Sequence, residues 1–147
     1  MKIQNYQTNM NNRLKFRVWS VKNNCFVTDG CNMSVLLSLK YEGPINSKDI
    51  YQQYTGLNDK DGKEIYEGDI VINTTSDEEY CSPAVIVWGK YEFVGFSLAY
   101  KCNKLEDYHA PLIHKINGVD LVEEFSLSKM GTYQIVGNAS ENPELLK

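Results

Sequence analysis

The sequence predicts a mostly β protein: a small, strongly bent antiparallel barrel or sandwich with a few short helices. Two observations carry this prediction. Short runs of β-branched and aromatic residues recur along the chain, and clusters of Gly, Asn and Asp separate them. The connections between these runs are short, which favours antiparallel pairing because parallel strands need crossovers of about a dozen residues or more.

The early part of the chain predicts a hairpin. Apolar and polar residues alternate at period two over Leu14–Trp19, which is typical of a half-buried strand. Asn23-Asn24 then predicts a turn, and Cys25-Phe26-Val27 predicts the returning strand. Residues 1–12 are rich in Asn and Gln and lack periodicity, so we expect a flexible N-terminal tail before the β domain of residues 13–147.

The segment Met33–Leu39 is apolar enough for a buried strand or a short helix. Ser34 and Ser38, with the bounding Gly30 and Gly43-Pro44, favour the strand. Ser47–Tyr51 is then either an extended lead-in to the next stretch or one turn of helix.

The densest turn chemistry lies in Tyr51–Val71, which reads YQQYTGLNDKDGKEIYEGDIV. Gly56 permits a sharp turn, because glycine adopts positive φ without a Cβ penalty. Asp61-Gly62 predicts a type I′ turn, in which both central residues have positive φ. Gly68-Asp69 predicts a second tight turn that leads into the strand Ile70–Ile72, and we expect Gly68→Val to destabilise more than Asp69→Ala.

Part of this stretch is similar to a calcium-binding loop, since Asp59, Asp61 and Gly62 follow one another closely. Such a loop needs a bidentate carboxylate at its twelfth position, and that position, counted from Asp59, is Ile70. The glycine required at the sixth position is also missing, because Glu64 stands there. An ordinary turn is therefore the favoured interpretation.

The rest of the chain predicts further strands. Asn73–Pro83 is polar and typical of a solvated loop, whereas Ala84–Trp88 is nearly continuously apolar and predicts a core strand. We expect another strand over Tyr91–Tyr100, bent at Gly95. The segment Asp120–Met130 fits either a short helix or a strand and a turn. Tyr133–Val136 predicts a last strand, and Asn142-Pro143-Glu144 predicts a terminal helix capped by Asn142.

The stretch YTGLNDKDGKEIYEGDIV resembles the core motif of the YopX family, whose members are small proteins of phages and prophages. Lys15–Trp19 resembles the family's N-terminal strand, and Tyr133–Asn138 with Glu141–Leu145 resembles its ending. Ser20 departs from the pattern, where an acidic residue often follows the Trp, and residues 74–119 show only general strand character. The resemblance implies a phage-associated, mostly β protein and no particular activity.

Composition limits the class of protein. The 147 residues fit one domain, or two small β units that share a core, and 42% of them are hydrophobic. A formal net charge of −4 at pH 7 argues against broad binding to nucleic acid, which usually needs a basic face. No apolar run approaches the roughly 20 residues that span a bilayer, and no secretory signal is recognisable. We therefore expect a cytoplasmic protein that does not enter a membrane.

No catalytic or metal site is recognisable. The four cysteines form no Cys-x-x-Cys pair, and the two histidines are His109 and His114. Pairing Cys102 with either histidine as a nucleophile is arbitrary without a local motif. We therefore expect no enzyme activity, no cofactor and no bound metal.

The aromatic residues suggest what the protein does. Ten tyrosines and two tryptophans are many for a small barrel, and aromatic side chains on a surface often mark interfaces. We expect a protein-interaction or self-assembly module, a homo-oligomer or a partner of another phage or host protein, with Trp19, Tyr54 and Tyr66 as contact residues. A nucleic-acid-binding or regulatory protein is the alternative, because Lys15, Arg17 and Trp19 share one face of their strand.

Overall fold

The computed structural model describes residues 14–74, 82–89, 95–101, 113–126 and 132–147. The chain divides into two compact units, Met1–Gly56 and Leu57–Lys147, and each is described by itself. Whether the two units fold as one domain with a shared core stays a prediction, and the expected tail of residues 1–12 lies outside the described residues. No helix in the described part of the chain is long and apolar enough to cross a membrane.

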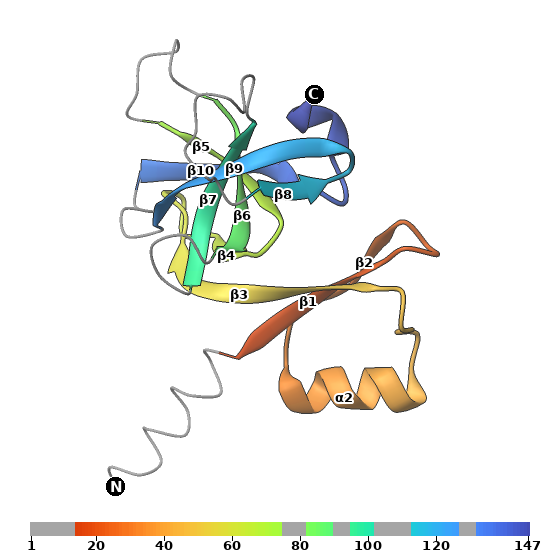
Figure 1. Ribbon diagram of the computed structural model, residues 1–147. Helices are drawn as coiled ribbons and strands as arrows, with labels where there is room; N and C mark the ends of the chain where they lie inside the picture. Colours follow the sequence, from red (N-terminus) through yellow and green to blue (C-terminus); the bar gives the residue numbers. More distant parts are fainter. Residues whose placement is uncertain (1–13, 75–81, 90–94, 102–112, 127–131) are drawn as a thin grey trace, which may run out of the picture. The chain divides into compact units, whose positions relative to one another are not determined.

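The first unit is a sheet covered by a helix (Figure 1). Strand β1 (Lys15–Ser20) pairs antiparallel with both β2 (Cys25–Asn32) and β3 (Ile50–Asn58). Asn24 takes positive φ in the turn between β1 and β2, which confirms the predicted hairpin. The core of the unit forms where Val18 of β1 packs with Leu36 and Ile45.

The segment for which a buried strand was favoured over a short helix is the helix α2 (Met33–Glu42), so the favoured interpretation was wrong and the alternative is correct. The side chain of Asn32 caps the helix, because its Oδ1 accepts a hydrogen bond from the backbone N–H of Val35 at 3.0 Å. The helix ends where Gly43 N–H donates to Leu39 O. A Cβ on residue 43 would lie 2.7 Å from that same oxygen, so the glycine marks a helix end rather than a strand boundary.

Gly56 does not make the sharp turn that its position suggested. It has a φ of 86° but lies inside β3, which continues through it to Asn58. The positive φ predicted for this glycine is correct, while the predicted change of chain direction is wrong. Strand β4 (Glu64–Tyr66) then completes the sheet order β2-β1-β3-β4.

The second unit is built on a curled, half-barrel antiparallel sheet (Figure 1). Its order is β10-β5-β6-β7-β9-β8, and the strands are β5 (Asp69–Asn73), β6 (Ala84–Gly89), β7 (Gly95–Lys101), β8 (Ile113–Ile116), β9 (Val119–Ser126) and β10 (Tyr133–Asn138). The side-chain amide of Asn117, between β8 and β9, donates to Ala139 O just beyond β10. This bond joins the two outer ends of the sheet, and the predicted bent, mostly β architecture is confirmed.

Both faces of the curled sheet carry apolar side chains. Within this sheet, Asp120–Ser126 belongs to β9 and is therefore strand rather than helix. Ile65 of β4 packs with the cluster on one face. Leu146, from the 3-10 helix η4 (Pro143–Leu146), packs with the cluster on the other face. The predicted terminal helix is therefore present, although Asn142 makes no side-chain cap to it.

Candidate functional site

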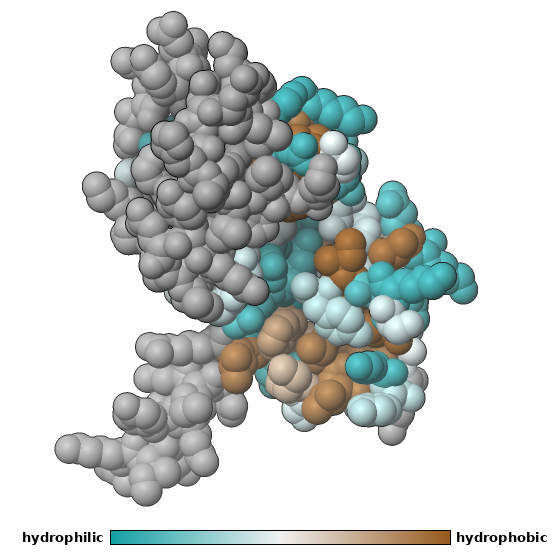
Figure 2. All heavy atoms as spheres, in the orientation of Figure 1, coloured by the Kyte–Doolittle hydropathy of each residue, from teal (hydrophilic) through white to brown (hydrophobic). Residues whose placement is uncertain are grey.

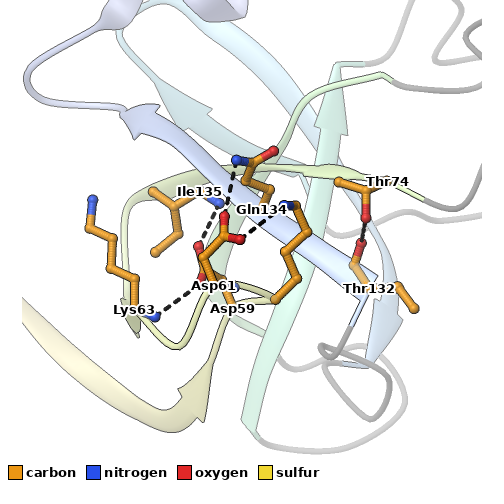
Figure 3. Close-up of polar contacts among 8 residues, drawn as sticks. Asp59, Asp61, Lys63, Thr74, Thr132, Gln134 and Ile135 are labelled. Carbon is orange, nitrogen blue, oxygen red and sulfur yellow. Dashed lines mark hydrogen bonds and ion pairs between the residues drawn. The ribbon is translucent and has the colours of Figure 1, made fainter.

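The turn of residues 59–63 is organised by the carboxylate of Asp59 (Figure 3). Its Oδ1 accepts hydrogen bonds from the backbone N–H groups of Asp61 and Lys63, both at 2.9 Å. Its Oδ2 accepts a third from the backbone N–H of Ile135 at 3.2 Å, 76 residues away in sequence. One buried side chain thus shapes its own turn and fastens it to a distant strand.

The electrostatic balance at Asp59 favours the charged carboxylate. Burial raises the pKa of this group, but the hydrogen bonds from the N–H groups of Lys63, Ile135 and Asp61, together with the nearby Lys63 charge, outweigh burial and lower the pKa below its usual 3.8. Asp59 is therefore ionised at neutral pH and acts as an acceptor of backbone donors.

The same arrangement disfavours a cation at this turn. The N–H groups point their positive ends at both oxygens of Asp59, and a metal ion would have to displace them. Among the described residues no cluster of three or more His, Cys, Asp or Glu could hold a metal ion. Cys81, Cys102 and His109 lie outside the described residues, so the expectation of no bound metal stays a prediction.

The predicted Asp61-Gly62 turn is present, but its type differs from the prediction. Only Gly62 has positive φ, at 84°, so the turn is not type I′. Gly62 N–H donates to Asp59 O at 3.0 Å, which makes residues 59–62 the β-turn. Asp59 N–H then donates to Lys63 O at 2.8 Å and closes the loop. The two side-chain bonds to Asp59 select this longer loop over a two-residue turn.

Further bonds attach this turn to β10. The backbone N–H of Lys60 donates to Tyr133 O at 2.9 Å. The Gln134 side-chain amide donates to Asp61 Oδ2 at 3.1 Å, on the exposed side of the contact (Figure 3). The turn therefore contacts three consecutive residues of the strand.

The second predicted turn, at Gly68-Asp69, also binds the end of β10. Gly68 has a φ of 82°, as predicted, and its carbonyl accepts from Ala139 N–H at 2.8 Å. Asp69 exposes only 1% of its surface. Its Oδ2 accepts from Tyr66 N–H at 2.8 Å, and its Oδ1 accepts from the Asn138 side-chain amide at 3.2 Å. Both turns are thus fixed by carboxylates to one strand.

The expected contact residues do not form an exposed surface. Trp19 exposes 5% of its surface and packs edge-on against Phe26, with ring centroids 4.9 Å apart. Tyr66 exposes 3%, and its hydroxyl donates to Glu64 Oε2 at 2.8 Å. A covered side chain has little area left for a partner, so the contact role expected of Trp19 and Tyr66 does not fit their burial. For the half-buried Tyr54 the contact role stays a prediction.

The face that suggested nucleic-acid binding is also largely covered. Arg17 is buried, its Nε donates to Gln52 Oε1 at 2.9 Å, and its guanidinium carbon lies 4.6 Å from the centre of the Phe26 ring. Lys15 Nζ lies 5.5 Å from the centre of the Tyr54 ring. These cations therefore pack against neighbours in their own unit, which is cation–π packing rather than a basic stripe.

Sequence reasoning missed the exposed apolar face of α2. Met33, Leu37 and Tyr41 expose 41%, 45% and 81% of their surfaces, and Val35 is also exposed. Figure 2 shows brown, apolar side chains gathered over the position that α2 occupies in Figure 1. The spacing of four between Met33, Leu37 and Tyr41 is visible in the sequence, but it is informative only once the segment is known to be helical.

These features define a class: a small, mostly β protein whose curled antiparallel sheet is bound at one strand by two carboxylate-centred turns. The family described as YopX protein matches residues 21–147, most of the chain, so the chain belongs to the YopX family. The matched range includes both turns and β10, but it begins after Lys15–Trp19, the strand that also resembled the family. The comparison with curated proteins gave no match.

Proposed function

We propose that this chain is a non-enzymatic protein-interaction module that self-assembles, with α2 as the contact between two copies. The observation that supports this proposal is the exposed apolar face of α2. Contiguous apolar patches on a protein surface commonly mark interaction sites, whereas single exposed apolar residues are ordinary.

The apolar side chains of α2 lie on two sides of the helix. Leu36 is buried in the core of its unit, and Leu39 packs beside it. Met33, Leu37 and Tyr41 are spaced by four residues and so form one stripe along the helix surface. The stripe extends over nearly the whole helix, on a side that remains exposed.

A second copy of the chain fits this stripe best. The stripe contains no charged residue that would select a partner of opposite charge, and the helix has its Lys and Glu, Lys40 and Glu42, only near its end. In a two-fold contact the same patch is used by both copies. Antiparallel packing of two α2 helices would place the two Lys40 side chains at opposite ends of the contact, away from each other.

The size of the stripe sets the strength of the contact. Three exposed side chains in each copy, at about half of the 1.5–3 kcal/mol for full burial, give about 5–9 kcal/mol of gross stabilisation. Association costs an estimated 4–15 kcal/mol or more. We therefore expect a weak dimer, with a Kd in the micromolar range or above.

Light scattering after size-exclusion chromatography tests the proposal. We expect the wild-type mass to rise with concentration above the 16.8 kDa of one chain, and Leu37→Glu to hold it at one chain. Leu145→Glu is the matched control, since Leu145 is similarly exposed (41%) but lies in η4. A wild-type mass of one chain at all concentrations, or equal association of both variants, would exclude the α2 contact.

The setting of this activity follows from the resemblance described above. We infer that the protein acts in the cytoplasm, for a phage or prophage, either with itself or with another phage or host protein. The covered positions of Arg17 and Trp19 give no support to nucleic-acid binding, so self-assembly is the function that we propose.

A further inference from the structure

Strand β10 lies at one edge of the six-stranded sheet, with β5 as its neighbour in the sheet order. An edge strand presents unpaired N–H and C=O groups, which can pair with a strand of another molecule. Proteins commonly protect such edges with a loop, a charge or a bulge.

The backbone pairing shows which groups of β10 face outward. Thr132 O accepts a hydrogen bond from Thr74 N–H at 2.9 Å, so residue 132 faces β5. Because successive residues of a strand point their backbone groups to opposite sides, Gln134 also faces β5, while Tyr133 and Ile135 face away from it.

These two outward-facing residues are the ones that the turn of residues 59–63 binds through their backbones. Lys60 N–H donates to Tyr133 O, and Asp59 Oδ2 accepts from Ile135 N–H. One donor and one acceptor thus occupy the edge where a neighbouring strand would supply the same pair of groups. Beyond Ile135 the pairing with β5 is irregular, which interrupts the edge further.

We propose that the turn of residues 59–63 is an edge cap, which prevents β10 from pairing with β10 of a second copy and which the Asp59 carboxylate holds in place. When the cap is released, the same edge is exposed in each copy. Two such edges can pair antiparallel about a two-fold axis, using main-chain groups alone.

The charges around the cap indicate that hydrogen bonds, rather than ion pairs, attach it to β10. Strand β10 reads YQIVGN and contains no ionisable carboxylate or cation. Among the described residues, the charged groups near Asp59 come from its own turn: Lys63, whose charge favours the carboxylate, and Lys60 with Asp61, which form an exposed ion pair at 3.0 Å. The attachment to β10 therefore depends on the bonds of Asp59 and Lys60 to the β10 backbone, with the exposed bond between the Gln134 side chain and Asp61 beside them.

The experiment uses the full chain with Leu37→Glu, so that association through α2 is removed and cannot be confused with association through β10. Into it we introduce Asp59→Asn, which retains one acceptor oxygen and places an amide against the N–H groups. The matched control is Glu141→Gln, which removes an exposed carboxylate of the same unit outside the turn. Lys60→Pro is a second variant, because it removes the N–H that binds Tyr133 O at a turn position that suits proline.

We expect Asp59→Asn and Lys60→Pro to form dimers as concentration rises, and Glu141→Gln to remain a single chain. In dilute solution, hydrogen exchange at the Ile135 amide should be about tenfold faster or more in Asp59→Asn than in Glu141→Gln, as for a loss of about 1.4 kcal/mol of protection. In the dimer that amide should regain protection.

The edge cap is excluded if both Asp59→Asn and Lys60→Pro remain single chains at all concentrations. It is equally excluded if either variant associates while its Ile135 amide stays as exchangeable as in dilute solution. Neither result depends on the α2 contact, which the comparison of wild type with Leu37→Glu decides separately.

Discussion

Replacing Asp69 by alanine should cost the second unit much of its stability. The carboxylate is almost completely buried, and it accepts one bond from Tyr66 N–H and one from the Asn138 side chain. In Asp69→Ala both donors lose this acceptor at a site that water does not reach. At about 1–3 kcal/mol for each buried polar group that loses its partner, the expected loss is about 2–6 kcal/mol.

This magnitude reverses the order that the sequence suggested for the two residues of the turn. Gly68→Val places a β-branched residue at a φ of 82°, a strain of about 1–3 kcal/mol. We therefore expect Asp69→Ala to destabilise at least as much as Gly68→Val. The burial of Asp69 and its bond to Asn138, 69 residues away, are the reason.

Urea unfolding followed by tryptophan fluorescence measures this loss. The chain has two tryptophans, Trp19 in the first unit and Trp88 in the second, so a Trp19→Phe background reports on the second unit. With a urea m-value of about 2 kcal/mol/M, a loss of about 4 kcal/mol would lower the midpoint by about 2 M. An Asp69→Ala midpoint within about 0.3 M of the parent would refute the reasoning, as would a smaller loss than in Gly68→Val.

Two further predictions concern Asp59 and Gly137. The folded-state pKa of Asp59 lies below its usual 3.8. The contribution of this carboxylate to folding stability is therefore fully present well above pH 3.8 and is lost as pH falls through the folded pKa. The urea midpoints of wild type and Asp59→Asn should converge below about pH 3.8, and a constant difference between them would contradict this. A Cβ on Gly137 would lie 2.6 Å from Leu145 Cδ1 and 2.9 Å from Asn142 Oδ1, so Gly137→Ala should cost about 1–3 kcal/mol in the same melts. An unchanged urea midpoint in Gly137→Ala would argue against crowding at η4.

Local patterns in the sequence predicted most of the strands. Alternation over Leu14–Trp19, the apolar run of Ala84–Trp88 and the turn at Gly68 each depend on neighbouring residues, and each is found where it was expected. The error at α2 has a local cause too. Ser34, Ser38 and Val35 are poor helix formers, and the Asn32 cap that begins the helix is one side-chain bond that composition does not reveal.

The sites depend on partners that are far away in the sequence. Asp59 was correctly assigned to a turn, but its third hydrogen bond goes to Ile135. The two turns and the ending of the chain were recognised as separate motifs, and only the fold shows that they bind one another. Trp19 and Tyr66 were expected on the surface because aromatic residues are abundant, whereas burial is decided by packing that periodicity does not encode.

The bond between Asp59 and Ile135 also affects the order in which the chain can fold. During synthesis, β1 and β2 are complete by residue 32 and are joined by a short turn, so the first hairpin can form early. Strand β5 pairs with β6 on one side, but its other side must wait for residues 133–138 of β10. Until then the Asp59 turn has no strand to bind, and one edge of β5 is exposed. We therefore expect the second unit to complete its sheet later than the first hairpin forms, which leaves a chaperone more time to bind it.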